Sequence, residues 1–338
     1  MSPSAGGSGG RPPTGVLVMA HGTPASPEGI EPFYTAIRRG RPPTPELLAE
    51  LTGRYRAIGG TSPLTERTRA QVDGLAAALE AADPGRFVVR YGAKFADPSI
   101  EAGIDDLTSL GVTGIIGIVL TPHQSVPGSE QYFQRARDAA SRSTVPIDIT
   151  PVRSWHRAEG LAELLAERTG ATLASLPPGA RRRTVVFFTA HSVPERAIAK
   201  GDPYAAQVAE SATDVAGRLG LDEREGIDWG VAWQSAGRTD DRWLGPDLNA
   251  EIRRVAEEGA TSVVVCPVGF VADHLEVLYD LDIEAAALAG QHGLVLARTP
   301  SLNDDPRFLE VLARAVRQAA DASASGDSGD SGDPVAPA

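Results

Sequence analysis

Short apolar runs alternate regularly with long, helix-favouring stretches along this chain, and few folds accommodate that pattern. The apolar runs show no polar-apolar alternation, and they lie at 16–20, 87–91, 115–120, 147–151, 185–189, 227–233, 263–268 and 294–298. The intervening stretches are rich in Ala, Leu, Glu and Arg, and the helices that they predict lie at 67–81, 98–110, 129–140, 160–174, 204–219 and 247–258. This alternation is typical of parallel sheets covered by helices on both faces. The sequence therefore predicts an α/β, doubly wound fold with a four-stranded parallel sheet in each half.

The two halves of the chain contain similar motifs. VLVMAHGTP at 16–24 and VFFTAHSVP at 186–194 both end an apolar run with Ala-His and continue to Pro. IVLTPHQSVP at 118–127 and VVVCPVGFVADH at 263–274 both end a run with Pro. The repetition predicts two similar Rossmann-like domains. Because functional groups gather beyond the carboxyl ends of parallel strands, we expect both Ala-His motifs to face one cleft between the domains.

The length of 338 residues is enough for about two domains of ~150 residues each. Gly, Ser, Pro and Asp dominate both ends of the chain and offer little to bury, which predicts disorder there. The proposed divisions are a tail at 1–14, a first domain at 15–165, a second domain at 166–320 and an acidic tail at 321–338. A Pro-Pro-Gly turn and three successive arginines place the domain boundary between about 160 and 183. We expect the last helix, 306–319, to close the body, where it could pack back on the first domain.

Composition excludes several classes of protein. The 32 basic and 44 acidic residues give a net charge of −12, which disfavours nucleic acid as a partner. The apolar runs are far shorter than the ~20 residues of a membrane span, so we expect no integral membrane segment. The single cysteine, Cys266, excludes an internal disulfide and a four-cysteine iron–sulfur cluster. The N-terminus has no apolar secretory stretch, which predicts a cytoplasmic protein.

Histidines and carboxylates follow several of the predicted strands. They are His21, His123 and His191, and then Asp273, His274, Glu276, Asp280 and Glu284. The sequence has no GxGxxG after its first strand, no GxxxxGK[ST] and no GxSxG, which argues against dinucleotide, P-loop and hydrolase chemistry. Nitrogen and oxygen ligands without thiolates suit Fe, Co, Ni or Zn.

Glu276, Asp280 and Glu284 are spaced by four residues, which on a helix places them on one drifting face. They could simply face water near a helix N-terminus. The apolar residues between them favour a second interpretation, a row of carboxylates that lines a cleft and conducts a divalent cation. His191 could likewise be an ordinary core histidine, but the matching His21 favours a functional role.

A basic loop lies early in the chain. Arg38, Arg39 and Arg41 follow Phe33 and Tyr34 and precede a Pro-rich turn. These arginines could be only a solvated loop, or they could bind the carboxylates of a ligand. The apolar neighbours favour a ligand that is flat, hydrophobic and anionic.

The residues from about 15 to 317 resemble the ferrochelatase family, most closely the soluble bacterial type of coproporphyrin-dependent haem biosynthesis. The segments that carry the resemblance are IRRGRPPTPELL (37–48), RYRAIGGTSPL (54–64), TAHSVPE (189–195), GDPYAAQV (201–208), WQSAGRTDDRWLGPDL (233–248) and PVGFVADHLEVLYDLD (267–282). The resemblance implies two domains around a porphyrin cleft and an enzyme, a lyase, that inserts Fe²⁺ into coproporphyrin III. It also implies a monomer whose contacts with other haem-pathway enzymes are at most transient.

The resemblance also implies roles for single residues. His191 resembles the metal-handling histidine of the family and Glu276 its acidic partner, so both are expected catalytic and metal-binding residues. Asp280 and Glu284 extend the metal-binding row, where an accessory Mg²⁺ could bind. The expected substrate-binding residues are His21, Arg38, Ser62, Gln71 and Tyr132. No permanently bound cofactor and no iron–sulfur cluster are expected, because Fe²⁺ is a substrate.

Metal insertion must remove protons from the pyrrole nitrogens, and a neutral His191 oriented by Glu276 could accept one. His21 departs from the soluble family, which commonly has tyrosine at this position, and resembles the histidine of smaller sirohydrochlorin and cobalt chelatases. Four alternatives therefore stay open: a protoporphyrin IX ferrochelatase, a cobalt or sirohydrochlorin chelatase, a non-catalytic haem-binding protein and, disfavoured by the missing secretory signal, a solute-binding protein.

Overall fold

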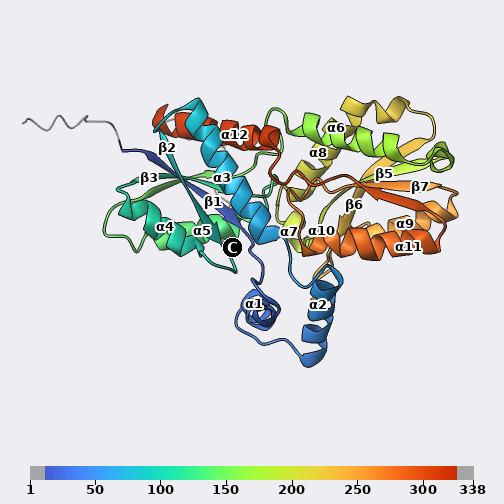
Figure 1. The fold of residues 1–338 in the computed structure, drawn as a ribbon, viewed down its shortest axis with the longest axis horizontal. Helices are drawn as coiled ribbons and strands as arrows, with labels where there is room; N and C mark the ends of the chain where they lie inside the picture. Colours follow the sequence, from blue (N-terminus) through green and yellow to red (C-terminus); the bar gives the residue numbers. More distant parts are fainter. Residues whose placement is uncertain (1–11, 326–338) are drawn as a thin grey trace, which may run out of the picture.

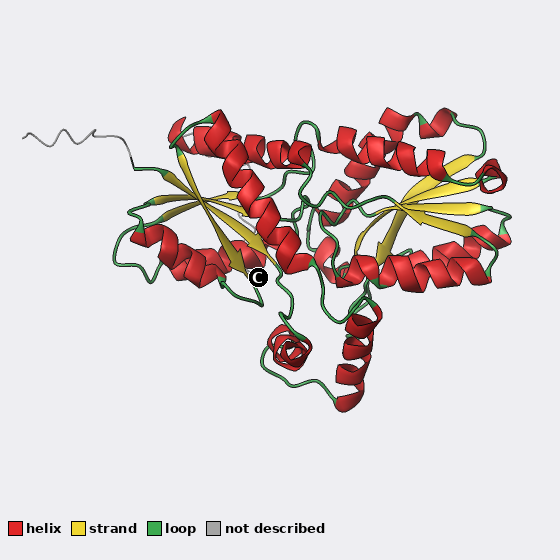
Figure 2. Cartoon of the chain, viewed as in Figure 1, coloured by secondary structure: helices red, strands yellow, loops and turns green. Residues whose placement is uncertain are grey.

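A computed structural model describes residues 12–325, which fold into two four-stranded parallel sheets flanked by helices (Figure 1, Figure 2). The first sheet has the strand order β2-β1-β3-β4 and consists of β1 (Thr14–Ala20), β2 (Phe87–Ala93), β3 (Gly114–Val119) and β4 (Asp148–Val152). The second has the order β6-β5-β7-β8 and consists of β5 (Thr184–His191), β6 (Ile227–Gln234), β7 (Ser262–Cys266) and β8 (Val295–Arg298). The predicted fold class and strands are confirmed.

Strands β1 and β5 take the same position in their sheets, and each pairs with a neighbour on both sides. Val16 and Val18 of β1 enter one apolar core, whereas Leu17 and Met19 enter a second core on the other face of the sheet. Burial on both faces explains why these strands lack polar-apolar alternation. The Ala-His motif therefore occurs at the same position in both sheets, because His21 follows β1 and His191 ends the matching strand β5.

Helices cover both sheets where the sequence predicted them. The predicted helices correspond to α3 (Leu64–Ala82), α4 (Ile100–Ser109), α5 (Ser129–Ala140), α6 (Leu161–Ser175), α8 (Tyr204–Leu219), α9 (Leu248–Glu257) and α12 (Pro306–Ser325). Further helices are α1 (Ile30–Ile37), α2 (Pro45–Ala57), α7 (Glu195–Ala199), α10 (Leu275–Leu278), the π-helix η4 (Asp280–Ala285) and α11 (Ala286–Gln291). Short 3₁₀ turns are η1 (Pro27–Gly29), η2 (Pro178–Arg182) and η3 (Leu221–Glu223). None of the helices in residues 12–325 has the length and apolarity to cross a bilayer.

Helices α1 and α2 form an arm, residues 30–57, that projects away from both sheets (Figure 1). The Thr44 side chain caps α2 by accepting a hydrogen bond from the Leu47 amide at 3.4 Å. The arm follows β1 in the chain, yet its α2 is bound to the second half: Arg54 lies 3.3 Å from Asp280, and Arg238 donates to Glu50. The arm thus connects the two halves beside the ends of β1 and β5.

The chain passes between the halves near the expected division and again before the last helix, which was expected to pack back on the first half. The division expected at 165/166 falls inside α6, and α6 contacts α8 and β7 of the second half. Helix α12 packs on α3 and β4, so the end of the chain completes the first half. Phe308 of α12 is fully buried there, with its ring 5.8 Å from that of Trp155.

The ordered body extends further than predicted at both ends. Thr14 pairs with Phe87 in the first sheet, so it is part of β1 and not of a tail. Helix α12 continues to Ser325, because Asp321 binds Arg86 and Ser323 hydrogen-bonds Thr150. The remainder of the two expected tails, 1–11 and 326–338, lies outside the described residues.

Candidate functional site

His191 and Glu276 form an ion pair at the carboxyl end of β5. His191 is the last residue of β5, and Glu276 lies in α10 beyond the end of β7. Nε2 of His191 is 3.6 Å from Oε1 of Glu276, and about one third of each side chain is exposed, 36% and 35%. Nδ1 of His191 donates to the Ser192 carbonyl at 2.6 Å, which fixes the ring orientation. The structure thus brings together the two predicted catalytic residues and leaves them accessible.

The environment of this pair favours charge on both partners. Burial by itself lowers the pKa of His191, but the Glu276 carboxylate and the Ser192 carbonyl outweigh it and raise the pKa to about 9. Burial also disfavours the Glu276 anion, yet His191 and His274 hold its pKa well below the usual range. The neutral His191 expected from the sequence is therefore wrong for the free site at neutral pH. An entering dication favours loss of this proton, because a metal binds only the neutral ring.

His274, which the sequence placed only among the possible metal ligands, is a second partner of Glu276. Its Nε2 lies 3.7 Å from Oε2 of Glu276, and its Nδ1 donates to the Ala272 carbonyl at 2.9 Å. The ring also rests on Phe270, with 4.9 Å between centroids. The Asp-His-Leu-Glu spacing was the available signal, since it places an imidazole two residues before the carboxylate.

The expected row of three carboxylates does not share one α-helical face. Glu276 lies in α10, whereas Asp280 and Glu284 lie in the wider turns of η4. Asp280 is buried and binds Arg54 at 3.3 Å and the Ser235 hydroxyl at 2.5 Å, while Glu284 is exposed. Burial and, to a lesser extent, the charge of Glu276 raise the pKa of Asp280 to about 6 despite the hydrogen bond from Ser235.

The sequence did not predict two residues that bind Asp280, namely Ser235 and Arg54. Ser235 has a left-handed backbone, with φ of 58°, which is uncommon for a residue other than glycine. The Arg54 guanidinium lies 4.9 Å from the centre of the Tyr279 ring. Nothing in the sequence pairs Arg54 with Asp280, because 226 residues separate them.

His21 occupies in the first half the position that His191 occupies in the second. The turn that follows it uses Gly22 at φ of +84°, where an added Cβ would lie 2.6 Å from that of Ala96. The His21 ring is exposed and lies between Phe33 at 5.8 Å and Phe95 at 4.9 Å. Surrounding protein desolvates the ring and lowers its pKa, and the charge of Glu276 opposes this effect from the other half. The pKa of His21 is therefore shifted in the direction opposite to that of His191.

The other predicted substrate-binding residues differ in their burial and in the groups that they contact. Tyr132 is buried in α5, where burial raises the pKa of its phenol and the charge of Glu276 adds to the effect. Arg38 ends α1, its Nε donating to the Arg41 carbonyl at 3.3 Å. Ser62 is buried and accepts from the Leu64 amide at 3.3 Å, just before α3. The Gln71 amide donates to the carbonyls of Val271 and Asn303 across the two halves, at 3.3 and 2.9 Å.

No group of three or more His, Cys, Asp or Glu side chains within residues 12–325 could hold a metal ion unaided. The metal-binding row of His191, Glu276, Asp280 and Glu284 therefore stays a prediction, and so does the accessory Mg²⁺. His123 is fully buried against Ser211, and burial lowers its pKa to about 3. The structure gives His123 a place at the contact between the halves.

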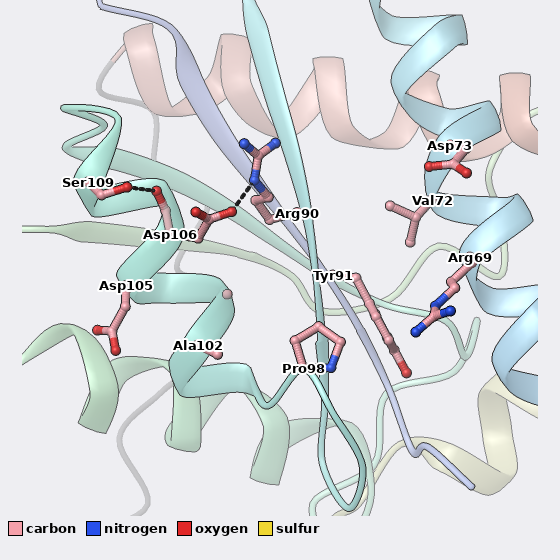
Figure 3. A pocket seen from close by; sticks show the side chains of 11 residues that line it. Arg69, Val72, Asp73, Arg90, Tyr91, Pro98, Ala102, Asp105, Asp106 and Ser109 are labelled. Atoms are coloured by element: carbon pink, nitrogen blue, oxygen red, sulfur yellow. Dashed lines mark hydrogen bonds and ion pairs between the residues drawn. The ribbon is translucent and has the colours of Figure 1, made fainter. Parts of the chain in front are cut away.

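A cavity of about 760 Å³ lies on another part of the molecule, between α3, α4 and the edge strand β2 (Figure 3). Its charged lining includes Arg69, Asp73 and Asp105, together with Arg90, which donates to Asp106. None of the predicted site residues lines this cavity.

Comparison with solved structures identifies the class of fold. SirB from Bacillus subtilis with Fe³⁺ has a TM-score of 0.56 at 14% identity, and the match covers 93% of this chain and 98% of SirB. The sirohydrochlorin chelatase SirB from Bacillus subtilis subspecies spizizenii, in complex with cobalt, has a TM-score of 0.54 at 13% identity, with coverage of 93% and 97%. The chain has the fold of these chelatases.

Comparison of sequences identifies the family. The model of the family Ferrochelatase matches residues 13–320. A ferrochelatase of Herpetosiphon aurantiacus is 39% identical over 303 residues, which cover 90% of this chain and 98% of that protein. The coproporphyrin III ferrochelatase of Bacillus pumilus is 41% identical over 311 residues, which cover 91% and 98%. The chain belongs to the ferrochelatase family, whose enzymes insert a metal into a porphyrin.

The buried carboxyl of Asp280 predicts a stability that depends on pH. Its pKa of about 6 lies above the usual 3.8, so ionising it in the fold costs free energy as pH rises through this interval. Asp280→Asn removes this cost. Relative to the wild type, we expect the variant to gain on the order of 2 kcal/mol of unfolding free energy between about pH 4 and pH 7. Urea unfolding at both pH values measures the gain, and a difference that does not change with pH contradicts the prediction.

Proposed function

We propose that this enzyme inserts Fe²⁺ into coproporphyrin III in haem biosynthesis, releasing the pyrrole protons as iron coproporphyrin III forms. The observation that carries the proposal is the accessible His191–Glu276 pair, together with His21 at the matching position of the first half. Relatives named for coproporphyrin III at 40–41% identity support this choice of porphyrin. Cytoplasmic location, a monomeric state and transient contacts with other haem-pathway enzymes stay predictions.

The ion pair supplies the groups that metal insertion needs. Glu276 is an anion that attracts Fe²⁺, and the approaching dication favours the neutral form of His191. Once neutral, His191 can hold the metal or accept a pyrrole proton, with Glu276 balancing the charge that develops. The pair thus releases a proton to solvent when the metal enters, and the Glu276 anion offsets half of the metal's charge.

Unpaired cations explain the choice of an anionic porphyrin. Arg38, Arg39, Arg41 and Lys94 form no salt bridge within the described part of the chain, although the protein has 44 acidic residues. Lys94 lies 4.9 Å from the centre of the Tyr132 ring and 5.3 Å from that of Phe95. Burial, together with the charges of Arg135 and Arg39, lowers its pKa to about 8. A carboxylate-rich ligand would relieve this repulsion, and coproporphyrin III carries more propionates than protoporphyrin IX.

Anaerobic turnover tests the proposed reaction. The assay combines Fe²⁺, Co²⁺ and Zn²⁺ with coproporphyrin III, protoporphyrin IX and sirohydrochlorin. We expect the highest kcat/KM for Fe²⁺ with coproporphyrin III, because its propionates meet the unpaired cations. A higher kcat/KM for another combination of metal and tetrapyrrole would favour one of the alternative chelatase reactions. Haem binding without turnover would indicate a non-catalytic protein.

Substitution of the ion pair tests the roles of its members. We expect His191→Ala and Glu276→Gln each to lower kcat by about 10²-fold or more, because the site loses its metal-attracting and proton-accepting groups. Porphyrin binding, followed by fluorescence, and thermal stability should stay close to wild type. His292→Ala is the control, since His292 is exposed at the end of α11. Wild-type turnover in either site variant would refute the mechanism.

His21 is expected to bind the iron of the product. An imidazole is a good axial ligand of haem iron, and His21 follows β1, the strand that matches β5 of His191. His21→Ala should shift the Soret band of the product complex and accelerate product release in stopped-flow traces. Its kcat for metal insertion should fall less than that of His191→Ala. An identical Soret band with and without His21 would show that this residue does not bind the iron and only lines the site.

A further inference from the structure

Helix α8 of the second half is bound to the segment that follows β3 in the first half, residues 120–128, here called the β3 loop. The Gln124 amide donates to the Gln207 side chain at 2.7 Å, and Nε2 of His123 lies 2.9 Å from the Ser211 hydroxyl. These contacts join two motifs that the proposed reaction has not used, TPHQSVP and GDPYAAQV.

Asp202, just before α8, is the buried centre of this contact. Only 6% of it is exposed, and no Arg or Lys in residues 12–325 forms a salt bridge with it. Its Oδ2 accepts from the Val126 amide at 2.7 Å and from the Ser125 hydroxyl at 3.4 Å. Its Oδ1 accepts from the Tyr204 amide at 2.9 Å. One carboxylate therefore fixes the β3 loop of the first half and the start of α8 together.

Tyr204 continues this connection to the site. Its ring packs between His123 at 6.0 Å and Trp233 at 5.7 Å, and 6% of the residue is exposed. Its hydroxyl donates to the carbonyl of His191 at 3.0 Å. The imidazole of His191 is in turn held by the next carbonyl, that of Ser192. The backbone of His191, which orients its ring, is thus hydrogen-bonded to the Tyr204 side chain. The position of Tyr204 in turn depends on contacts with the first half.

We propose that Tyr204 is a positioning residue for His191, and that Asp202 couples this position to the docking of the two halves. The proposal rests on the catalytic role of His191 argued above. Tyr204 contacts the backbone of His191 and not its ring, so its effect should appear in the chemical step and not in porphyrin binding. The bonds of Asp202 to the β3 loop and to the Tyr204 amide then align His191 with the groups that the first half supplies.

Tyr204→Phe tests the proposal, because it keeps the buried ring and removes only the hydroxyl. We expect kcat to fall about fivefold, as for the loss of one neutral hydrogen bond, with unchanged KM for porphyrin and Fe²⁺. Asp202→Asn should give the same pattern, since it keeps the shape but replaces one of the two acceptor oxygens with an NH2 group that faces a backbone N–H. The series uses the porphyrin and metal that the wild type turns over fastest, so it does not depend on the choice of coproporphyrin III.

Ser211→Ala is the matched control. It removes a hydrogen bond between the same helix and the β3 loop but does not touch His191, so its kcat and KM should match the wild type even where its melting temperature falls. An unchanged kcat in Tyr204→Phe, or an equal fall of kcat in Ser211→Ala, would overturn the proposal. His191→Ala in the same series separates the two proposals. An active His191→Ala enzyme refutes the role of His191, whereas wild-type kcat in Tyr204→Phe beside an inactive His191→Ala enzyme refutes only the positioning role.

Discussion

The contact between the two halves is the constraint on which the site depends, because neither half contains the site alone. His21 and Tyr132 come from the first sheet and its helices, whereas His191 and Glu276 come from the second. Buried polar groups hold the two sets together, with Gln71 donating to carbonyls near Glu276 and Asp202 binding the β3 loop. A buried hydrogen bond tolerates little displacement, so these contacts fix the distance between the sets more tightly than apolar packing would.

A duplicated scaffold here carries two different kinds of histidine. His21 and His191 end matching central strands, so the backbone gives them the same setting. Glu276 lies 3.6 Å from His191 and raises its pKa, whereas desolvation dominates at His21 and lowers it. The asymmetry comes from the segment after β7, which has no acidic counterpart in TPHQSVP after β3. Duplication thus supplied two equivalent positions, and one loop made them chemically distinct.

The sequence predicted most of the fold because continuous apolar runs are a strong signal of buried parallel strands, and β1 and β5 show it clearly. It predicted His191 and Glu276 because each follows such a strand. It missed the arm, where Pro and Gly interrupt the helical pattern, and it missed η4, since a π-helix has no distinct periodicity. Arg54, Ser235 and Tyr204 escaped for another reason, which is that their roles depend on partners distant in the sequence.

The return of α12 to the first half has a consequence for how the chain folds during synthesis. Phe308 and Leu309 fill the core beside α3 and Trp155, and Arg317 binds Asp83 at 2.7 Å. The first sheet is translated early, yet the helix that covers it is synthesised only after the whole second sheet. The first half therefore keeps an open apolar face until α12 has been made, and the two halves reach their final state together rather than one after the other.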